Sequence, residues 1–386
     1  MRLSIVTSAV AAALVSFGGT VAIVIAAAQA VGANSAQTAS AVIGLCLSAI
    51  VCSTYLGWRY RMPIITAWSA PGIALIAASH GLTPETAAGA FVFAGLLILL
   101  TAAIRPLSGL IQKLPVAIAA AMLAGVLFRF CTEVFTAAGA DPMLVAPLVV
   151  IFLIARQISS SGAVLIVLLF GVAIAFFLGQ VGPLPAHLPE PALAFTVPAL
   201  DLQIMVGVGV PLYIVTMASQ NLPGYAVLQS SGYKPPLSPL LAVTALASIA
   251  TAPLGAVTSN LGALSAAICT GPDSHPSPEK RWLTTPFYAL SYVVFGISGA
   301  AIVALIAALP PNLIAAFAGL ALLGPLVNAL GTALNDGTYR FPAVFTFVVT
   351  ASGVTVFGIG SAFWGILAGL AALGVERARY RGAKGV

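Results

Sequence analysis

The sequence predicts an all-α integral membrane protein with 14 transmembrane segments, arranged as two inverted repeats of seven. Of its 386 residues, 60% are hydrophobic and only 6% are charged, whereas soluble domains carry roughly 25% charged residues. The apolar residues fall into blocks of about 17 to 27, close to the roughly 20 that a helix needs to cross a bilayer. The basic residues lie between these blocks in a pattern that fits one fixed orientation in the membrane.

Gly, Pro, Asn and charged residues divide the chain into fourteen apolar segments. The expected segments span residues 4–30, 36–56, 62–79, 84–104, 115–135, 140–157, 162–180, 203–221, 237–252, 255–270, 284–309, 311–331, 341–357 and 359–375. The first segment imitates a signal peptide, with Ala28 and Ala30 as small residues at a cleavage site, but it is about twice as long as a typical signal h-region. We therefore interpret it as the first span. A proline-rich gap at 181–202 divides the chain into halves of similar size.

The distribution of positive charge predicts that both termini lie in the cytoplasm. With the N-terminus inside and the spans alternating, Arg129 is the one residue among the 15 Lys and Arg that falls near the outside. A single wrong span would scramble this distribution. The sequence therefore favours an even number of crossings.

The third and tenth segments are short and interrupted. Each begins with a proline and a β-like stretch, and each continues into a small-residue helix too short to cross the membrane alone. An offset of 190 residues pairs Pro63 with Pro253, Ser69 with Ser259 and Gly72 with Gly262. Interrupted segments at matching places in two halves indicate a transporter binding site. Since seven spans per half invert the second half, the two half-helices should point their N-termini at each other near the midplane.

The composition excludes several other classes of protein. The cysteines Cys46, Cys52, Cys131 and Cys269 show no CxxC spacing and are expected as small apolar core residues, and the three histidines form no metal cluster. The basic residues form no aromatic-interleaved stripe, so we expect no nucleic-acid partner. No HExxH motif or buried catalytic constellation is present, and we expect neither an enzyme nor a cofactor.

Three stretches resemble the BenE family of benzoate/proton symporters: PIITAWSAPG (63–72), PLYIVTMASQNLPG (211–224) and TSNLGALSAAI (258–268). The family is related to the uracil permease and the sulfate permease group. The resemblance implies a core domain of residues 1–104 and 201–309 and a gate domain of residues 105–200 and 310–386. It also implies import of benzoate or a related aromatic carboxylate with protons, across a bacterial-type inner membrane. An anion channel or exchanger, or a nucleobase permease, of the same fold stays an alternative. A homodimer is compatible with the sequence.

The predicted site is built for an anion. The uracil permease places acidic residues on spans eight and ten, whereas Gln220, Asn221, Ser259 and Asn260 stand in that region here. Two facing helix N-termini together offer about one unit of positive charge and free amide donors. We expect the amides of Ala70, Gly72 and Ile73 at one end, and those of Leu261, Gly262 and Ala263 at the other, behind a cap at Ser259 or Asn260. Glycine at 72 and 262 would let a ligand approach the backbone, although small residues in membrane helices also serve packing.

Aromatic side chains near the interrupted segments could receive the ring of the substrate. Phe17, Trp68 and Tyr213 are the candidates, and each could instead be core or lipid-facing packing. The candidate binding residues are therefore Phe17, Gly18, Thr66, Trp68, Ser69, Ala70, Gly72, Ile73, Tyr213, Met217, Gln220, Asn221, Ser259, Asn260, Leu261 and Gly262. Glu133 and Asp336 are the candidates for proton coupling. An ion pair of Glu133 with Arg129 and a turn at Asn335-Asp336-Gly337 are the competing interpretations.

Overall fold

The computed structural model describes residues 3–18, 20–79, 81–104, 115–158, 162–183, 191, 193–356 and 361–383. His80, His187 and the basic residues Arg2, Arg105, Lys113 and Lys384 lie outside these ranges, as do parts of the proline-rich gap and the first two residues of the predicted last segment.

The first half of the chain is helical apart from one short strand. Its elements are α1 (Leu3–Gly18), α2 (Val21–Ala30), α3 (Ser35–Tyr60), β1 (Thr66–Trp68), α4 (Ala70–Ala77), α5 (Pro84–Ala103), α7 (Val116–Ala140), α8 (Pro142–Ile158) and α9 (Gly162–Phe177). The start of α3 is fixed by a capping box, in which Asn34 accepts from the Gln37 amide and the Gln37 side chain accepts from the Asn34 amide.

The second half repeats this order with more interruptions. Its elements are α10 (Leu202–Ile204), η1 (Met205–Gly209), α11 (Val210–Thr216), η2 (Met217–Asn221), α12 (Leu222–Ser230), α13 (Leu237–Thr251), η3 (Ala252–Leu254), β2 (Ser259–Leu261), α14 (Ala263–Thr270), η4 (Pro278–Leu283), α15 (Thr284–Ile297), α16 (Gly299–Ala307), α17 (Pro311–Leu334), η5 (Gly337–Tyr339), α18 (Arg340–Ala351) and α19 (Ser361–Ala383). Each of the fourteen predicted segments contains helix.

The protein has the surface and the helix lengths of a multi-pass membrane protein. Within the described residues, seven helices are long and apolar enough to cross a membrane, and an eighth span forms if the bent pair α15–α16 counts as one. Large apolar side chains face outward, among them Phe135 and Phe177, because a bilayer rather than water surrounds them. The fold is therefore an all-α membrane fold, and the number of fourteen crossings stays a prediction.

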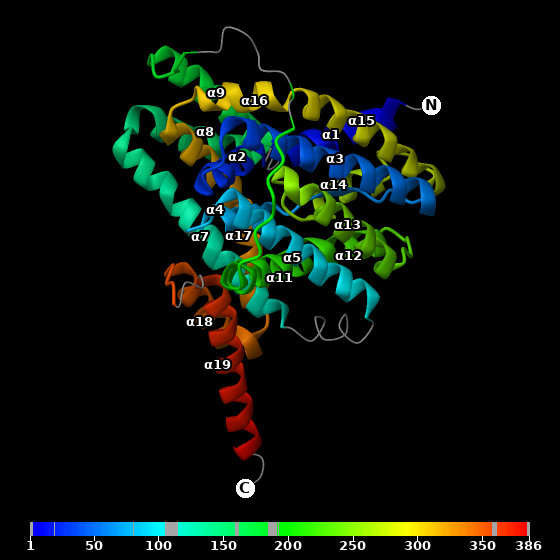
Figure 1. Cartoon of the computed structure of the whole chain (residues 1–386), viewed down its shortest axis with the longest axis vertical. Helices are drawn as coiled ribbons and strands as arrows, with labels where there is room; N and C mark the ends of the chain where they lie inside the picture. Colours follow the sequence, from blue (N-terminus) through cyan, green and yellow to red (C-terminus); the bar gives the residue numbers. More distant parts are fainter. Residues whose placement is uncertain are drawn as a thin grey trace.

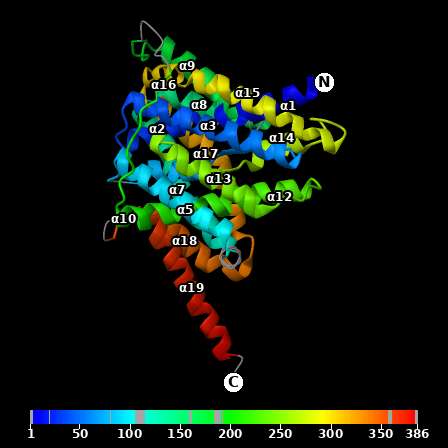
Figure 2. The ribbon, with the colours of Figure 1, turned by 45° about the vertical axis from the view of Figure 1, so that its right-hand side comes forward.

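The helices form two packed groups. A second apolar cluster joins α7, α8, α9 and α17, together with Ala22 of α2, through residues such as Val134, Leu148 and Phe317. The main cluster draws on α1–α5 and α11–α16, and also on the other faces of α7 and α17 and on the start of α19. Figure 1 shows α7 and α17 crossing between these helices and the α18–α19 pair, with the end of α19 projecting from the body. The segment 193–200 runs along one face of the molecule toward α10 (Figure 2).

Small residues bring α19 against α18. A side chain at Gly365 would overlap the Thr350 hydroxyl, and one at Gly369 would overlap the Thr346 hydroxyl. Glycines spaced by four on one helix thus face threonines spaced by four on its neighbour. This small-xxx-small spacing lets backbones approach closely where lipid removes the hydrophobic drive for helices to associate.

The two repeats are related by an offset of 193 residues, and the predicted offset of 190 is wrong. Adding 193 to β1 and α4 gives the bounds of β2 and α14, residues 259–261 and 263–270. Ser69 therefore corresponds to Gly262 and not to Ser259. The sequence alignment slipped by three residues because Ala, Gly and Ser recur throughout both segments, so that neighbouring registers give similar numbers of identities.

Candidate substrate-binding site

Two short strands hold the half-helices α4 and α14 at the centre of the molecule. β1 and β2 pair antiparallel, with Thr66 opposite Leu261, Ala67 opposite Asn260 and Trp68 opposite Ser259. All six residues are buried. One residue separates each strand from the helix that follows it, so the antiparallel pairing places the N-termini of α4 and α14 at opposite ends of the same small sheet.

Most backbone N–H groups at the start of α4 are already hydrogen-bonded to the N-cap residue, Ser69. The Ser69 hydroxyl accepts a hydrogen bond from the Gly72 amide at 3.0 Å, and the Ile73 amide donates to the Ser69 carbonyl at 2.8 Å. Pro71 has no N–H to offer. Of the three amides predicted at this end, Ala70 alone stays available, which corrects the prediction for Gly72 and Ile73.

The N-terminus of α14 lies further along the chain than predicted. Ser259 and Asn260 belong to β2, so the prediction that either caps α14 is wrong; the N-cap is Gly262, which has no side chain to accept a hydrogen bond. The Leu261 amide donates to Asn221 Oδ1 at 3.0 Å and the Gly262 amide to the Ile65 carbonyl at 2.9 Å. The free amides are therefore those of the first turn, at Ala263, Leu264 and Ser265.

Asn260 braces the first half-helix instead of capping the second. Oriented by its hydrogen bonds, its side-chain oxygen accepts from the Ser69 amide at 2.7 Å and its nitrogen donates to the Leu261 carbonyl at 3.1 Å. Ser259 is held in the same way, because its amide donates to the Ser248 hydroxyl at 2.8 Å and its hydroxyl to the Ala67 carbonyl at 3.4 Å. Both polar side chains therefore hydrogen-bond to backbone groups of the sheet or of Ser69 next to it.

The two glycines expected to admit a ligand differ in their surroundings. A Cβ at Gly72 would lie 2.5 Å from Leu212 Cδ1 and 2.9 Å from the Ser69 hydroxyl, so glycine there permits packing against α11. A Cβ at Gly262 would meet Ala67 at 3.4 Å, an ordinary contact. The packing interpretation therefore applies to Gly72, while Gly262 leaves α14 uncapped.

Two π-helical turns shape the interrupted eighth segment. η1 precedes Pro211 and η2 precedes Pro223, and a proline removes the donor that would close a regular helical turn. π-turns occur frequently at functional sites. The second turn contains Met217, half-buried Gln220 and fully buried Asn221, whose amide nitrogen donates to the Met217 sulfur at 3.4 Å. Because Asn221 also holds Leu261, it ties this segment to β2.

An aromatic cluster lies beside the half-helices and includes two of the three predicted rings. Phe17 stacks on Phe295 with ring centroids 4.4 Å apart, and Trp68 meets Phe17 and Tyr292 edge to face at 6.0 Å and 5.7 Å. The Trp68 ring nitrogen donates to the Thr20 hydroxyl at 2.9 Å. Phe17 is the last buried residue of α1, which ends one residue later at Gly18. The ring therefore lies at the break between α1 and α2, which begins at Val21.

The α15 tyrosines were missed by the sequence analysis. The Tyr288 hydroxyl donates its one proton to the Thr66 carbonyl at 3.1 Å, and it also shares a hydrogen bond with the Tyr292 hydroxyl at 3.1 Å. Two tyrosines four residues apart on one face of an apolar segment were the available signal. Beside them a Ser16–Ser265 hydrogen bond links α1 to the first turn of α14. The Thr66 hydroxyl is itself engaged by Ser53 at 2.8 Å.

Tyr213 and the two proton-coupling candidates lie elsewhere. The Tyr213 hydroxyl pairs with that of Thr101 on α5 at 2.6 Å. Asp336 accepts from the Thr338 amide at 2.9 Å and begins η5, which is the predicted turn. Glu133 is exposed on α7, and no ion pair joins it to Arg129, both of which the structure describes.

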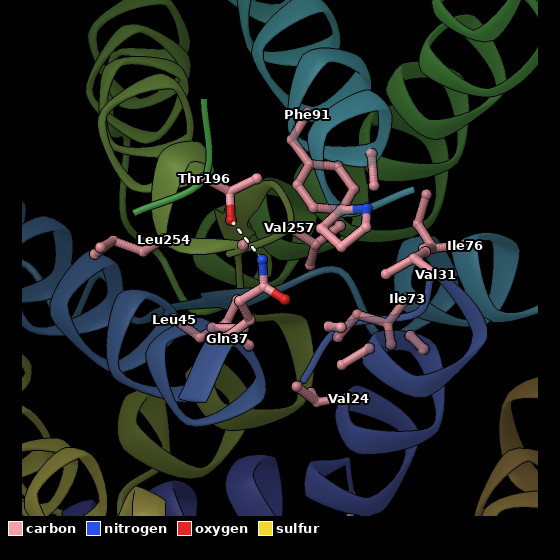
Figure 3. Close-up of a pocket in the computed structure, with 17 residues that line it drawn as sticks. Val24, Val31, Gln37, Leu45, Ile73, Ile76, Phe91, Thr196, Leu254 and Val257 are labelled. Carbon is pink, nitrogen blue, oxygen red and sulfur yellow. Dashed lines mark hydrogen bonds between the residues drawn. The ribbon is translucent and has the colours of Figure 1, made fainter. Parts of the chain in front are cut away.

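Two cavities flank α4. The first, shown in Figure 3, lies among α2, α3, α4 and α5, has an empty volume of about 570 Å³, and is almost entirely apolar. Its polar side chains are Gln37 and Thr196, and the Gln37 amide nitrogen donates to the Thr196 hydroxyl at 3.3 Å. The second cavity, of similar volume, is lined by Leu75, Ser79, Arg129 and Thr355 among others.

The chemistry of the central site suits an anion. Asp and Glu are absent from α1–α4, α11, η2, α12, α14 and α15, and no metal-binding group of His, Cys, Asp or Glu occurs in the part of the chain that the structure describes. Uncapped helix amides next to aromatic rings offer hydrogen bonds to a carboxylate and contact area to an apolar ring. Fold and site together define a membrane transporter, not an enzyme.

Comparisons with known proteins also indicate a membrane transporter. The family model of BenE, the benzoate membrane transport protein, matches residues 1–375, and the chain belongs to this family. It is 36% identical over 359 residues to inner membrane protein YdcO of Escherichia coli, covering 93% of this chain and 92% of the relative. It is 35% identical over 362 residues to the benzoate membrane transport protein of Acinetobacter baylyi, covering 94% and 92%.

Solved structures share the fold at low sequence identity. The transmembrane domain of the cyanobacterial bicarbonate transporter BicA superposes with a TM-score of 0.62 at 13% identity, covering 96% of this chain and 98% of that one. SLC26A9 gives a TM-score of 0.62 at 11% identity over 95% of this chain and 64% of its own. These similarities establish the fold alone.

Proposed function

We propose that the protein imports benzoate or a related aromatic carboxylate together with protons, by movement of a core domain against a gate domain. The core comprises residues 1–104 and 201–309 and the gate residues 105–200 and 310–386. The apolar cluster that joins α7, α8, α9 and α17 supports this division, although α7 and α17 also pack into the main cluster. The inner membrane location, with both termini in the cytoplasm, rests on the positive charge distribution and on the YdcO relative.

The observation that carries the proposal is the uncapped N-terminus of α14. Three free amides at a helix start attract a carboxylate, because about half a unit of positive charge sits there. Ala70 offers a further amide from α4, and the ring of the substrate would lie toward Phe17 and Trp68. A relative that is a benzoate membrane transport protein supports the aromatic acid as the substrate.

Energetics favour a coupled cation. An aromatic carboxylate has a pKa close to that of Glu, about 4.3, and is therefore an anion at neutral pH. A potential of 100 mV, inside negative, opposes its entry by about 2.3 kcal/mol. A co-transported proton cancels that penalty. Since Asp336 is engaged in a turn, Glu133 is the better of the two candidate proton carriers.

Uptake into proteoliposomes tests the proposal. With labelled benzoate, an inward proton gradient should drive accumulation above equilibrium, and ionophores that collapse both the pH gradient and the potential should abolish it. Counterflow separates a carrier from the alternative of an anion channel, because a carrier exchanges labelled for unlabelled substrate at an accelerated rate. Uracil and sulfate as competitors test the nucleobase and inorganic-anion alternatives. Accumulation that survives the ionophores would refute proton coupling.

A further inference from the structure

The second cavity lies between α4 and η1 on one side and α7, α18 and α19 on the other. Leu75, Ala78 and Ser79 at the C-terminal end of α4 and Gly207 of η1 line one side. Residues of α7, of α18 and of the start of α19 line the other, including Arg129, Thr350, Thr355, Ser361 and Ala362. The cavity therefore lies between elements that we assign to the core and to the gate. Its polar residues are hydroxyls and one guanidinium.

Arg129 enters this cavity without a counter-charge. It is half-buried, and none of the described acidic side chains forms an ion pair with it. Its guanidinium lies against the turn that follows α18, since a Cβ at Gly353 would come within 2.6 Å of Arg129 Nη1. Gly353 has a φ of 68°, so both its conformation and the space favour glycine there. The turn thus makes room for the guanidinium.

Thr350 lines the cavity, but its hydroxyl is packed against Gly365 of α19, where a Cβ would overlap it. Thr350 is 1% exposed, and its hydroxyl has no hydrogen-bond partner among the described residues. Buried polar groups are normally hydrogen-bonded, and ionisable residues within a membrane protein mark functional sites. An unpaired guanidinium in a cavity that is also lined by Ser79, Thr355 and Ser361 has the chemistry that binds a carboxylate.

We propose that this cavity is an anion-loading site, in which Arg129 holds the carboxylate of the substrate on its way to or from the half-helices. This inference rests on the proposed function for the identity of the anion. α4 connects the two places, because Ser79 and Leu75 line the cavity while Ala70 lies at the opposite end of the helix. Eight helical residues span about 12 Å, which is a short step for a small acid.

Cysteine labelling tests the charge of the cavity without any transport. The four native cysteines are buried, at 0% to 4% exposure, whereas Thr355 is exposed at the cavity wall. In Thr355→Cys protein, a negatively charged methanethiosulfonate should react faster than a positively charged one. Adding Arg129→Gln should lower that ratio of rates by roughly tenfold, whereas Arg129→Lys should largely preserve it. The reason is that a nearby positive charge attracts the anionic reagent and repels the cationic one at the intermediate dielectric of a protein cavity. Arg156→Gln removes a gate-domain charge outside the cavity and should leave the ratio unchanged.

A second measurement tests whether benzoate protects the cavity from labelling. Saturating benzoate should slow labelling by the anionic reagent in the Thr355→Cys protein and not in the Thr355→Cys/Arg129→Gln protein. Arg129→Gln should also raise the KM for benzoate uptake about tenfold with little change in the maximal rate. An unchanged labelling ratio in Arg129→Gln overturns the anion site. If Arg129→Gln changes the labelling ratio while the wild-type protein transports no benzoate, the anion site stands and the proposed function is refuted.

Discussion

Ala67 and Asn260 pair with each other across the β1–β2 sheet, and the same two residues are related by the 193-residue offset between the repeats. The approximate two-fold axis of the inverted repeats therefore passes through the centre of the sheet. Symmetry at this point is broken by the caps, because Ser69 closes the start of α4 with a hydroxyl while Gly262 leaves the start of α14 open. A single anion is therefore expected nearer to α14.

Asn260→Asp should destabilise the folded protein. The Asn260 amide nitrogen faces the Leu261 carbonyl at 3.1 Å, and a carboxylate oxygen in its place would face that carbonyl without a proton to share. A buried charge left uncompensated costs about 3 kcal/mol or more. We expect a lower melting temperature in detergent and a partial recovery at acidic pH, where the carboxyl protonates. Asn335→Asp, at the exposed end of α17, is the control and should melt like the wild type.

Gly224→Ala should disturb the site more than Gly262→Ala. A Cβ at Gly224 would lie 2.6 Å from Leu261 Cβ and 3.0 Å from the Leu261 carbonyl oxygen, and the backbone of β2 cannot easily move. Overpacking of this kind costs roughly 1 to 3 kcal/mol. At Gly262 the same methyl group makes ordinary contacts. Melting curves of the two variants side by side check the difference, and equal stability would contradict the packing assigned to Gly224.

The fold was largely predictable because its main signals are local. Blocks of apolar residues located the helices, and the prolines and small residues at 63–72 and 253–262 located both interrupted segments together with their β-stretches. The three-residue error in the repeat offset arose because helix starts in Gly- and Ala-rich segments carry little side-chain information. Gly262 is an N-cap by its backbone position, and no side-chain pattern marks it.

The site was predictable in its elements and less so in its contacts. Phe17 and Trp68 were expected near the half-helices and lie in one aromatic cluster. Tyr292 and Phe295 complete that cluster from α15, which is distant in sequence, and only tertiary packing brings them there. The hydrogen bonds between the side chains of Asn221 and Asn260 and the backbone of the sheet and its flanks depend on register, which composition does not specify.

Gly369→Val should separate α19 from α18. A side chain at position 369 would overlap the Thr346 hydroxyl, whereas a Cβ at Gly374 on the same helix would have no described atom within 4 Å. Close helix contact through small residues is a main source of stability between membrane helices. We expect Gly369→Val to lower the melting temperature and Gly374→Val to leave it nearly unchanged. Two equally stable variants would show that the α18–α19 contact contributes little.

Arg281→Met should loosen the C-terminal end of α14. The buried guanidinium donates to the carbonyls of Thr270 at 2.6 Å and His275 at 2.7 Å, and Thr270 is the last residue of the helix. A cation there complements the helix dipole, and hydrogen bonds from a charged group are worth roughly 1.5 to 3 kcal/mol each. The variant should be less stable and more readily cut by protease in residues 271–283. Lys280→Met, which removes a neighbouring exposed charge, is the matched control.

Gly262→Asp provides the sharpest test of the binding site. Gly262 has φ −85° and ψ 97°, a conformation that any residue adopts, and aspartate is a strong N-cap. Its carboxylate would accept hydrogen bonds from the first turn of α14 and occupy the place that we assign to the carboxylate of the substrate. Two unit charges about 4 Å apart at an effective dielectric of 20 repel by about 4 kcal/mol, so benzoate affinity should fall about a thousandfold. Gly262→Ala supplies the backbone and volume control and should bind within a few-fold of the wild type. Binding is measured by thermal shift or calorimetry on purified protein at pH 8, where the new carboxyl is ionised. Near-normal benzoate affinity in a well-folded Gly262→Asp protein would show that the substrate carboxylate does not lie at this helix end.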